Sequence, residues 1–230
     1  MMTPVTPAGA STAHHEGVTL CLRAVEQHFH QVFDELARWE RSLSQLFGDG
    51  PVSAAMATAA IASRAIAFLD GPHHLVGAGF VASRGALSDR ALYLAWWQGD
   101  DRRLLAEPTL TATDTFDYTR RPWFANPERT GRRHLTGPYV DVVCTDEYTV
   151  TATAPVTVGG RMVGVVGADT LVETLEDLLL PDLRLADATL VNEHGRAVVS
   201  ADPHVGPGDH VNGTRETLAC AGLPLAVVLH

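Results

Sequence analysis

The chain has 230 residues, of which 46% are apolar, and its 17 basic and 27 acidic side chains leave a formal net charge of −10. This apolar fraction is normal for a globular protein with a real core, so disorder throughout the chain is excluded. The acidic balance disfavours a broad phosphate-binding surface, because nucleic acids are bound by clustered Lys and Arg. We therefore expect no nucleic-acid partner.

Cysteine content and hydropathy indicate the cellular compartment in which the chain is expected. Cys21, Cys144 and Cys220 are widely spaced and odd in number, which fits neither a disulfide framework nor a metal knuckle, so we expect reduced, semi-buried thiols. The N-terminus lacks the charged start and apolar core of a secretory signal, and no apolar run approaches the roughly 20 residues that a membrane helix needs. As written, the chain is predicted to be cytoplasmic, or extracytoplasmic if it is a piece of a longer receptor.

The N-terminal part is predicted to be a tail followed by one long helix. Residues 1–17 are rich in Pro, Ala, Ser and Thr and are expected to be disordered, and residues 18–50 form the helix, which ends at Gly48-Asp49-Gly50-Pro51. Its apolar residues alternate in steps of three and four, as in a coiled-coil seam: Leu22, Val25, Phe29, Val32, Leu36, Trp39, Leu43 and Leu46. Such a seam packs either on its own domain or on a twin helix across a homodimer axis, and the sequence leaves both open.

A second helix and a sheet with one polar face are predicted next. Residues 52–69 are Ala-rich and are followed by Asp70-Gly71-Pro72, which favours a helix stop. The period then changes to two, and the strand candidates are residues 75–82, 91–98, 148–158 and 161–168, with Gly159-Gly160 as a two-residue hairpin turn. Thr149, Thr151 and Thr153 face one way along their strand. One side of this sheet is therefore expected to be polar.

The C-terminal part is predicted to form a smaller module. Thr170 and Glu173 have the spacing of a capping box, and a short leucine-rich helix is expected to end at Pro181. Strand candidates follow at residues 188–192, 196–201, 217–220 and 225–229. The predicted fold class is α+β, in which the long helix packs on an antiparallel sheet module, residues 51–180, and a reduced α/β module, residues 181–230, follows.

Three short motifs carry the most specific chemistry. They are Arg121-Pro122-Trp123-Phe124, then Gly137-Pro138-Tyr139-Val140-Asp141, then Gly164-Val165-Val166-Gly167-Ala168-Asp169. A guanidinium presents two parallel donors to a carboxylate, and such charge-assisted pairs are stronger than neutral hydrogen bonds. Two carboxylates and a phenol can take up the three donors of an ammonium group. In a single pocket, this cation and these two carboxylates suit a small zwitterion.

The stretch from Asp117 to Asp169, with the order of elements around it, resembles a Cache domain, the PAS-like sensor family of extracytoplasmic bacterial receptors. The resemblance covers roughly residues 22–229 and is weaker in the second module, which would also be PAS-like. In the double-Cache receptors that bind amines and carboxylates, an Arg-x-Trp pair holds the ligand carboxylate, whereas a Tyr-x-Asp pair and a later Asp hold its ammonium. The resemblance thus implies that Arg121 and Trp123 bind a carboxylate.

By the same resemblance, Tyr139, Asp141 and Asp169 bind an amine. The implied function is a noncatalytic sensor for an amino acid or a related amine or organic acid, with an unidentified output partner. The family has tyrosine five residues before the arginine and just after the tryptophan, where this chain has Phe116 and Phe124. Tyr118 replaces a lost hydroxyl only if the loop register shifts, and otherwise a ligand group that the pocket was built to pair is rejected by orders of magnitude.

Each motif residue also has a plain structural interpretation. Asp169 could cap a helix, Asp141 could be a turn acid paired with an arginine, and Trp123 and Tyr139 could be core side chains. The strand around residue 95 offers two aromatic faces, either of which could line the pocket. Tyr93 and Trp97 are on one of these faces, and Leu92, Leu94 and Trp96 are on the other.

Other classes of chemistry find little support. The pairs His14-His15, His28/His30 and His73-His74 are not joined to Cys or carboxylate at a ligand spacing, so no metal site is predicted. The chain has no nucleophile elbow and no phosphate-cradling glycine loop, so neither an enzyme nor a cofactor is predicted. The alternative function is a structural or adaptor protein whose pocket is filled by its own side chains, with Phe116 and Phe124 as plugs.

Overall fold

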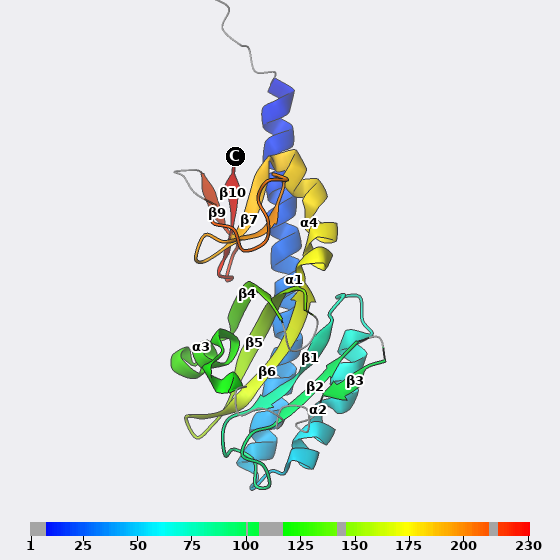
Figure 1. Cartoon of the computed structure of the whole chain (residues 1–230), viewed down its shortest axis with the longest axis vertical. Helices are drawn as coiled ribbons and strands as arrows, with labels where there is room; N and C mark the ends of the chain where they lie inside the picture. The colour runs from blue at the N-terminus through cyan, green and yellow to red at the C-terminus, as the bar shows by residue number, and fades with distance from the viewer. Residues whose placement is uncertain (1–7, 100, 106–116, 142–145, 212–215) are drawn as a thin grey trace, which may run out of the picture.

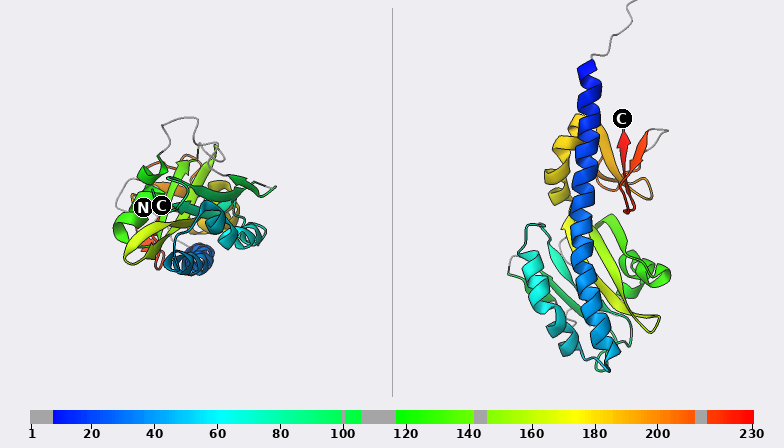
Figure 2. Two further views of the ribbon diagram at one scale, coloured as in Figure 1. Left: turned by 90° about the horizontal axis from the view of Figure 1, so that it is seen from below. Right: turned by 180° about the vertical axis from the view of Figure 1, so that it is seen from behind.

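The computed structural model describes residues 8–99, 101–105, 117–141, 146–211 and 216–230, with side chains from residue 15 onward. Helix α1 (Ala8–Gly48) runs the length of an elongated molecule and contacts both modules (Figures 1 and 2). Over these described ranges, no helix combines the length and apolar character that crossing a bilayer requires.

The larger module is a six-stranded antiparallel sheet in the order β3-β2-β1-β6-β5-β4. Its strands are β1 (Gly77–Ala82), β2 (Leu94–Gln98), β3 (Arg103–Leu105), β4 (His134–Val140), β5 (Tyr148–Val158) and β6 (Arg161–Leu171). Gly159 and Gly160 turn the β5–β6 hairpin with φ values of 58° and 79°, which confirms the predicted turn. β3 and β4 lack a period-two signal, because β3 is three residues long and β4 contains Gly137-Pro138.

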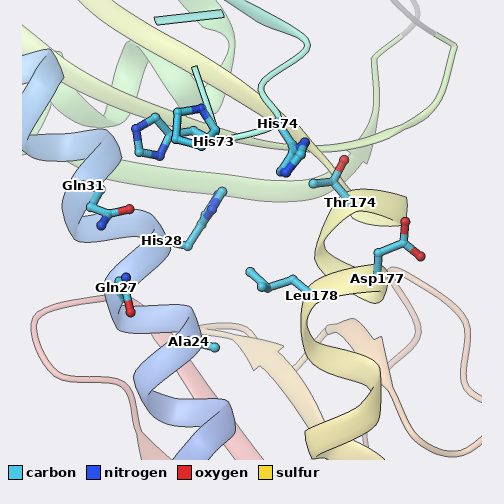
Figure 3. Close-up of a pocket in the computed structure, with 10 residues that line it drawn as sticks. Ala24, Gln27, His28, Gln31, His73, His74, Thr174, Asp177 and Leu178 are labelled. Atoms are coloured by element: carbon cyan, nitrogen blue, oxygen red, sulfur yellow. The ribbon is translucent and has the colours of Figure 1, made fainter. Parts of the chain in front are cut away.

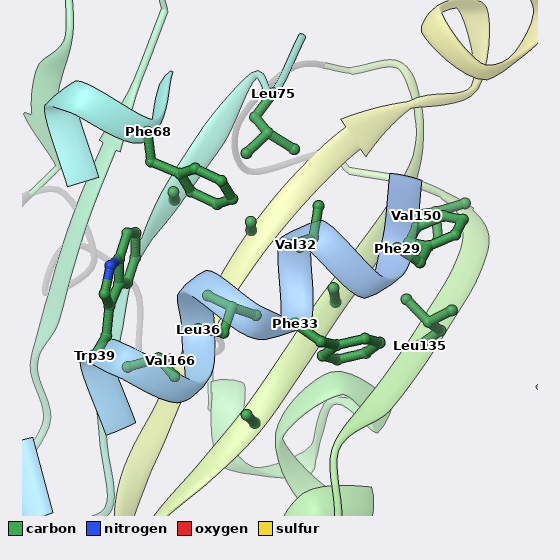
Figure 4. Close-up of a cluster of buried hydrophobic side chains, with 14 of the residues drawn as sticks. Phe29, Val32, Phe33, Leu36, Trp39, Phe68, Leu75, Leu135, Val150 and Val166 are labelled. Atoms are coloured by element: carbon green, nitrogen blue, oxygen red, sulfur yellow. The ribbon is translucent and has the colours of Figure 1, made fainter. Parts of the chain in front are cut away.

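Helices cover both faces of this sheet. α1 and α2 (Ala54–Leu69) pack on one face, and the short α3 (Pro122–Thr130) packs on the other face near β4 and β5 (Figures 1 and 2). Figure 4 shows α1 side chains against the sheet, where Trp39 meets the Phe68 ring edge-on at a centroid distance of 5.6 Å. Each such apolar side chain stabilises the fold by about 1.5–3 kcal/mol when fully buried.

The coiled-coil-like seam of α1 is used within the chain. Its six central residues are at most 1% exposed: Val25, Phe29, Val32, Leu36, Trp39 and Leu43. They belong to one core cluster together with side chains of α2, α4 and the sheet. Of the two predicted packings, the intramolecular one is therefore correct, and these positions are not available as a homodimer seam.

The start of α1 differs from the prediction. The helix begins at Ala8, so the prediction of a disordered tail is wrong for residues 8–17. Gly17 lies so close to α4 (Val172–Ala186) that a Cβ there would come within 2.8 Å of the Ala186 backbone nitrogen. The close packing of α1 on α4 at Gly17 favours the helix, although the Pro, Ala, Ser and Thr content of residues 1–17 favours disorder.

Helix α4 corrects two further predictions. Thr170 lies inside β6 and Leu171 occupies the N-cap position without a side-chain bond, so the capping box is wrong. Pro181 lies inside the helix, and the predicted module boundary after residue 180 therefore falls within α4. The helix continues because its buried side chains, Leu175, Leu179, Leu183 and Ala186, lie on both sides of Pro181, whose ring is exposed to solvent.

The smaller module is a four-stranded sheet in the order β8-β7-β10-β9. Its strands are β7 (Ala188–Asn192), β8 (Ala197–Ser200), β9 (Thr217–Ala219) and β10 (Leu225–Leu229), close to the predicted positions. Asn192 Nδ2 donates a 2.7 Å hydrogen bond to the Gly137 carbonyl of β4, which ties this module to the larger one. Two cysteines, Cys21 and Cys220, are free and buried, and burial raises the pKa of each thiol to about 12, whereas Cys144 lies outside the described residues.

Candidate functional site

The face of the large sheet opposite α1 carries a row of residues that cross the strands at one level. Thr136 of β4 pairs with Thr151 of β5, Thr151 pairs with Asp169 of β6, and Asp169 pairs with Gly77 of β1. Directly opposite residues of antiparallel strands project to the same face. The predicted polar face is therefore present, and Asp169 is part of it rather than a helix cap.

A chain of hydrogen bonds joins two of the predicted site residues. The Thr151 hydroxyl donates to Asp169 Oδ1 at 2.7 Å, and the Tyr139 hydroxyl lies 2.7 Å from the Thr151 oxygen. Because a threonine hydroxyl has a single proton, which Asp169 receives, Tyr139 is the donor in the second bond. Thr151 is thus the link between Tyr139 and Asp169, and the alternation of threonines along the strand was the signal that could have identified it.

The two aspartates of the motifs influence each other electrostatically. Asp169 is 5% exposed and Asp141 is 8% exposed. Burial, together with the charge of Asp141, raises the pKa of Asp169 to about 7 against the opposing effect of the Thr151 hydrogen bond. At neutral pH, Asp169 is therefore close to its midpoint of titration, and a nearby cation would favour its ionised form.

Asp141 also has a structural role at the end of β4. Its backbone N–H donates to the Glu147 carbonyl at 3.0 Å, and its carbonyl accepts from the Asp146 N–H at 2.8 Å. These bonds hold the chain where it leaves the sheet, so the backbone of Asp141 lies in a turn, as the structural interpretation predicted. Its side chain is buried and close enough to act on Asp169.

Several polar atoms on this face are buried and unpaired. Trp96 Nε1, Thr136 Oγ1 and Thr153 Oγ1 have no hydrogen-bond partner among the described residues. A buried polar group without a partner costs about 1–3 kcal/mol, and native proteins keep few of them. These atoms lie on the same face of the sheet as Asp169.

Glycines shape the face beside Asp169. A Cβ placed on Gly77 would lie 2.5 Å from Trp96 Nε1 and 3.3 Å from Asp169 Oδ2, and one on Gly167 would lie 3.3 Å from the Trp96 ring. The indole of Trp96 therefore lies across the positions where other residues would carry side chains. Of the two aromatic faces predicted for β2, the one with Trp96 belongs to this site, while Tyr93 and Trp97 pack in the core with α1.

Helix α3 brings the Arg-x-Trp motif to the same face. Arg121 is the N-cap residue of α3, Pro122 occupies its first turn, and Gly131 ends it with a φ of 64°. Arg121 is exposed, as is Arg120, and Trp123 is half-buried. Phe124 is fully buried in a cluster with Trp96, Val165 and Tyr118, so it packs α3 against the sheet.

Tyr118 acts as a structural residue. Its hydroxyl donates to the Ala82 carbonyl at 2.8 Å and accepts from the Tyr93 N–H at 3.0 Å. Its ring stacks on Trp123 at a centroid distance of 6.3 Å. The hydroxyl is engaged by the backbone, so the expectation that Tyr118 replaces a missing ligand contact is wrong in this structure. Phe116 lies outside the described residues.

The segment that carries the polar face matches a known family of sensor domains. Residues 86–177 match the family model of the first PDC sensor domain of methyl-accepting chemotaxis protein-like receptors. This segment contains all of the motif residues, and the match confirms the resemblance that the sequence indicated.

The individual proteins that the chain resembles are chemoreceptors. The methyl-accepting chemotaxis protein PctB of Pseudomonas aeruginosa is 31% identical over 104 residues, which are 44% of this chain and only 16% of that receptor. The ligand-binding domain of the Campylobacter jejuni chemoreceptor Tlp3, solved with L-norvaline, has a TM-score of 0.68 at 12% identity and covers 100% of this chain and 94% of that one. The ligand-binding domain of the amino-acid chemoreceptor PctC of Pseudomonas aeruginosa, solved with GABA, has a TM-score of 0.58 at 19% identity, over 94% of this chain and 98% of that one. These structures show the α+β fold.

Proposed function

We propose that the chain is a noncatalytic sensor module that binds a small amine-bearing carboxylate, most simply an amino acid, on the polar face of the large sheet. Arg121 receives the carboxylate with Trp123 beside it, and Tyr139, Asp141 and Asp169 receive the ammonium group. The observation that carries this proposal is the pair of buried carboxylates, Asp141 and Asp169, on a face with unpaired threonine hydroxyls, where the pKa of Asp169 is raised to about 7.

An ammonium group supplies what this face lacks. It brings a positive charge to two buried carboxylates and three N–H donors to acceptors that already lie close together. At the other pole, Arg121 stands at the N-terminus of α3, where the positive end of the helix dipole also favours an anion. A zwitterion therefore satisfies both poles at once, whereas a simple anion or a simple amine satisfies one.

The relatives support a sensory role. Solved structures with the same fold are described as complexes with isoleucine, L-valine, L-norvaline and GABA. One further structure of this fold, with a TM-score of 0.56 at 13% identity over 83% of this chain and 68% of that one, is the extracellular domain of the putative histidine kinase mmHK1S-Z3. We therefore favour the extracytoplasmic placement over the cytoplasmic one, with the module as part of a longer receptor.

Calorimetric titration with panels of amino acids, amines and organic acids tests the proposal. We expect at least one amino acid to bind, and we expect Arg121→Ala and Asp169→Asn to weaken it by about tenfold or more, since each removes a charged partner worth about 1.5–3 kcal/mol. Arg120→Ala is the matched control, because it removes an exposed guanidinium one residue away and is expected to leave the affinity unchanged.

Two results would count against the proposal. Silence of the folded wild-type protein across all three panels would refute the sensor function. Binding that Arg121→Ala and Asp169→Asn leave unchanged would refute the assigned site while leaving the function in place.

A further inference from the structure

On each face of the large sheet, a histidine joins a helix to a strand. On the α1 side, His28 borders a pocket between α1, α4 and the loop from α2 to β1 (Figure 3), and its Nε2 atom lies 3.2 Å from the Thr170 hydroxyl oxygen of β6. On the polar face, the Nε2 atom of His134 on β4 lies 2.9 Å from the Nδ2 atom of Asn126 on α3. This second contact involves the helix that carries the Arg-x-Trp motif of the proposed site.

His134 belongs to the polar face, one level along the strands from Asp169. It pairs directly with Thr153 of β5, which pairs with Gly167 of β6, two residues before Asp169. Directly opposite residues of antiparallel strands project to the same face, and so do residues two apart on one strand. The half-buried imidazole of His134 therefore lies on the side of the sheet that carries both α3 and Asp169.

The orientation of the Asn126 amide determines the state of this imidazole. Asn126 Oδ1 accepts from Arg129 Nη2 at 3.4 Å, so the Nδ2 group faces His134. An amide nitrogen only donates, and His134 Nε2 therefore accepts, which places the ring proton on Nδ1. Burial lowers the pKa of His134 below its ordinary value, Glu193 of the turn between β7 and β8 opposes this shift, and His194 and Arg129 support it. At neutral pH the imidazole is uncharged and remains an acceptor.

Helix α3 depends on its contacts for its position. It has nine residues, and an isolated helix of this length is marginal in water. Phe124 and Pro127 are its buried residues, but apolar packing is non-directional and leaves rotation about the helix axis loosely defined. In the part of the chain that the structure describes, the Asn126–His134 bond is the one hydrogen bond between residues 122–130 and the sheet. Because a hydrogen bond is directional, this contact sets the rotation of α3.

The rotation of α3 determines where the motif residues point. Asn126 and Trp123 are three residues apart and are thus neighbours on the helix surface, and Arg121 is the N-cap of the same helix. A tilt or rotation of α3 would displace Arg121 and Trp123 together relative to Asp169. Bidentate pairing of a guanidinium with a carboxylate requires aligned groups, so this displacement weakens the hold on a ligand carboxylate.

We propose that Asn126 and His134 are positioning residues for the carboxylate end of the site. Their hydrogen bond orients α3 so that Arg121 and Trp123 face a ligand whose ammonium group is held at Asp169. This inference rests on the proposed function, and it adds that a contact outside the ligand determines how strongly the carboxylate is recognised. The ammonium end does not depend on this contact, because its residues belong to the sheet.

Paired titrations test this role. Each amino acid of the calorimetric panel is compared with the amine that loss of its carboxylate gives, such as L-norvaline with butylamine and L-valine with isobutylamine, and NMR measures the weaker amines. We expect Asn126→Leu and His134→Leu each to weaken the amino acid that binds at least fivefold and its amine less than twofold. The double variant should bind no more weakly than either single variant, since both substitutions remove the same bond. Thermal unfolding checks that each variant is folded.

Two further variants serve as controls. His134→Gln is expected to keep most of the wild-type affinity, because the glutamine amide oxygen can accept near the position of Nε2. Glu128→Gln changes an exposed residue of the same helix and is expected to leave the ratio of the two affinities unchanged.

The outcomes separate this role from the proposed function. Equal weakening of the amino acid and its amine, losses that add in the double variant, or full affinity in both single variants would overturn the positioning role and leave the proposed function in place. Silence of the folded wild-type protein toward every amino acid would overturn both.

Discussion

Replacement of Asp169 by asparagine tests the electrostatics of the polar face directly. In the folded protein the pKa of Asp169 is raised from 3.8 to about 7, mainly by burial. A carboxyl whose pKa is raised on folding binds more protons in the folded state than in the unfolded state between these two values. The free energy of unfolding contributed by this group is therefore largest at low pH and is lost as the pH rises toward and through 7.

The size of this effect follows from the shift. With an unfolded pKa of 3.8 and a folded pKa of about 7, linkage gives a loss of about 2 to 3 kcal/mol in the free energy of unfolding between pH 5 and pH 8. Asparagine has no titration, so in Asp169→Asn this loss should disappear and the variant should be the more stable protein at pH 8. His28, whose pKa is lowered by burial, acts with the opposite sign in both proteins and cancels in the comparison.

Urea unfolding at pH 5, 6, 7 and 8, followed by tryptophan fluorescence, measures this difference. We expect the free energy of unfolding of the wild type to fall relative to that of Asp169→Asn as the pH rises. A difference that stays constant from pH 5 to pH 8 would show that Asp169 does not titrate in this range and would refute the reasoning.

Four further substitutions have defined outcomes. Thr151→Val removes the hydrogen bond to Asp169 Oδ1 and the partner of the Tyr139 hydroxyl, so we expect a loss of about 1–3 kcal/mol in urea unfolding and a further rise in the pKa of Asp169 by NMR titration; an unchanged carboxyl titration would contradict this. Gly79→Ala places a Cβ 2.1 Å from the Ala95 carbonyl oxygen, whereas the Cβ of Gly77→Ala lies 2.5 Å from Nε1 of the Trp96 side chain, which can move. We therefore expect Gly79→Ala to lower the melting temperature more than Gly77→Ala does, and Gly77→Ala to change mainly the ligand affinity and the indole fluorescence. Asn192→Asp keeps the acceptor for the His194 and Arg196 N–H groups but loses the donor to the Gly137 carbonyl. We expect it to lower the free energy of unfolding by about 1–2 kcal/mol and to speed hydrogen exchange in β4. Exchange in β4 at the wild-type rate would show that this contact does not tie the modules together.

The parts of the fold that periodicity determines were predictable. The seam of α1, the β5–β6 hairpin and the threonine face all follow from local patterns, and the structure confirms them. The missed helix α3 carries weak but recognisable signals, namely Pro122 in its first turn and Gly131 at its C-terminus.

The errors arose where tertiary contacts outweigh a local signal. Thr170 and Glu173 have a capping spacing, but pairing with Val150 keeps Thr170 in a strand. Pro181 signals a helix end, but the leucines on either side of it are held against α1. The link through Thr151 required the register of β4 with β5, which is shifted between Thr136 and Tyr139 in a way that local patterns do not encode.

The 41-residue length of α1 gives its contact with Thr170 a mechanical consequence. At 1.5 Å per residue such a helix is a rod of about 60 Å, and it resists axial compression because every turn is closed by backbone hydrogen bonds. His28 lies near the middle of this rod, next to the residue that follows Asp169. A displacement of β6 parallel to the axis of α1 on ligand binding would therefore move the end of α1 that lies beside the second module.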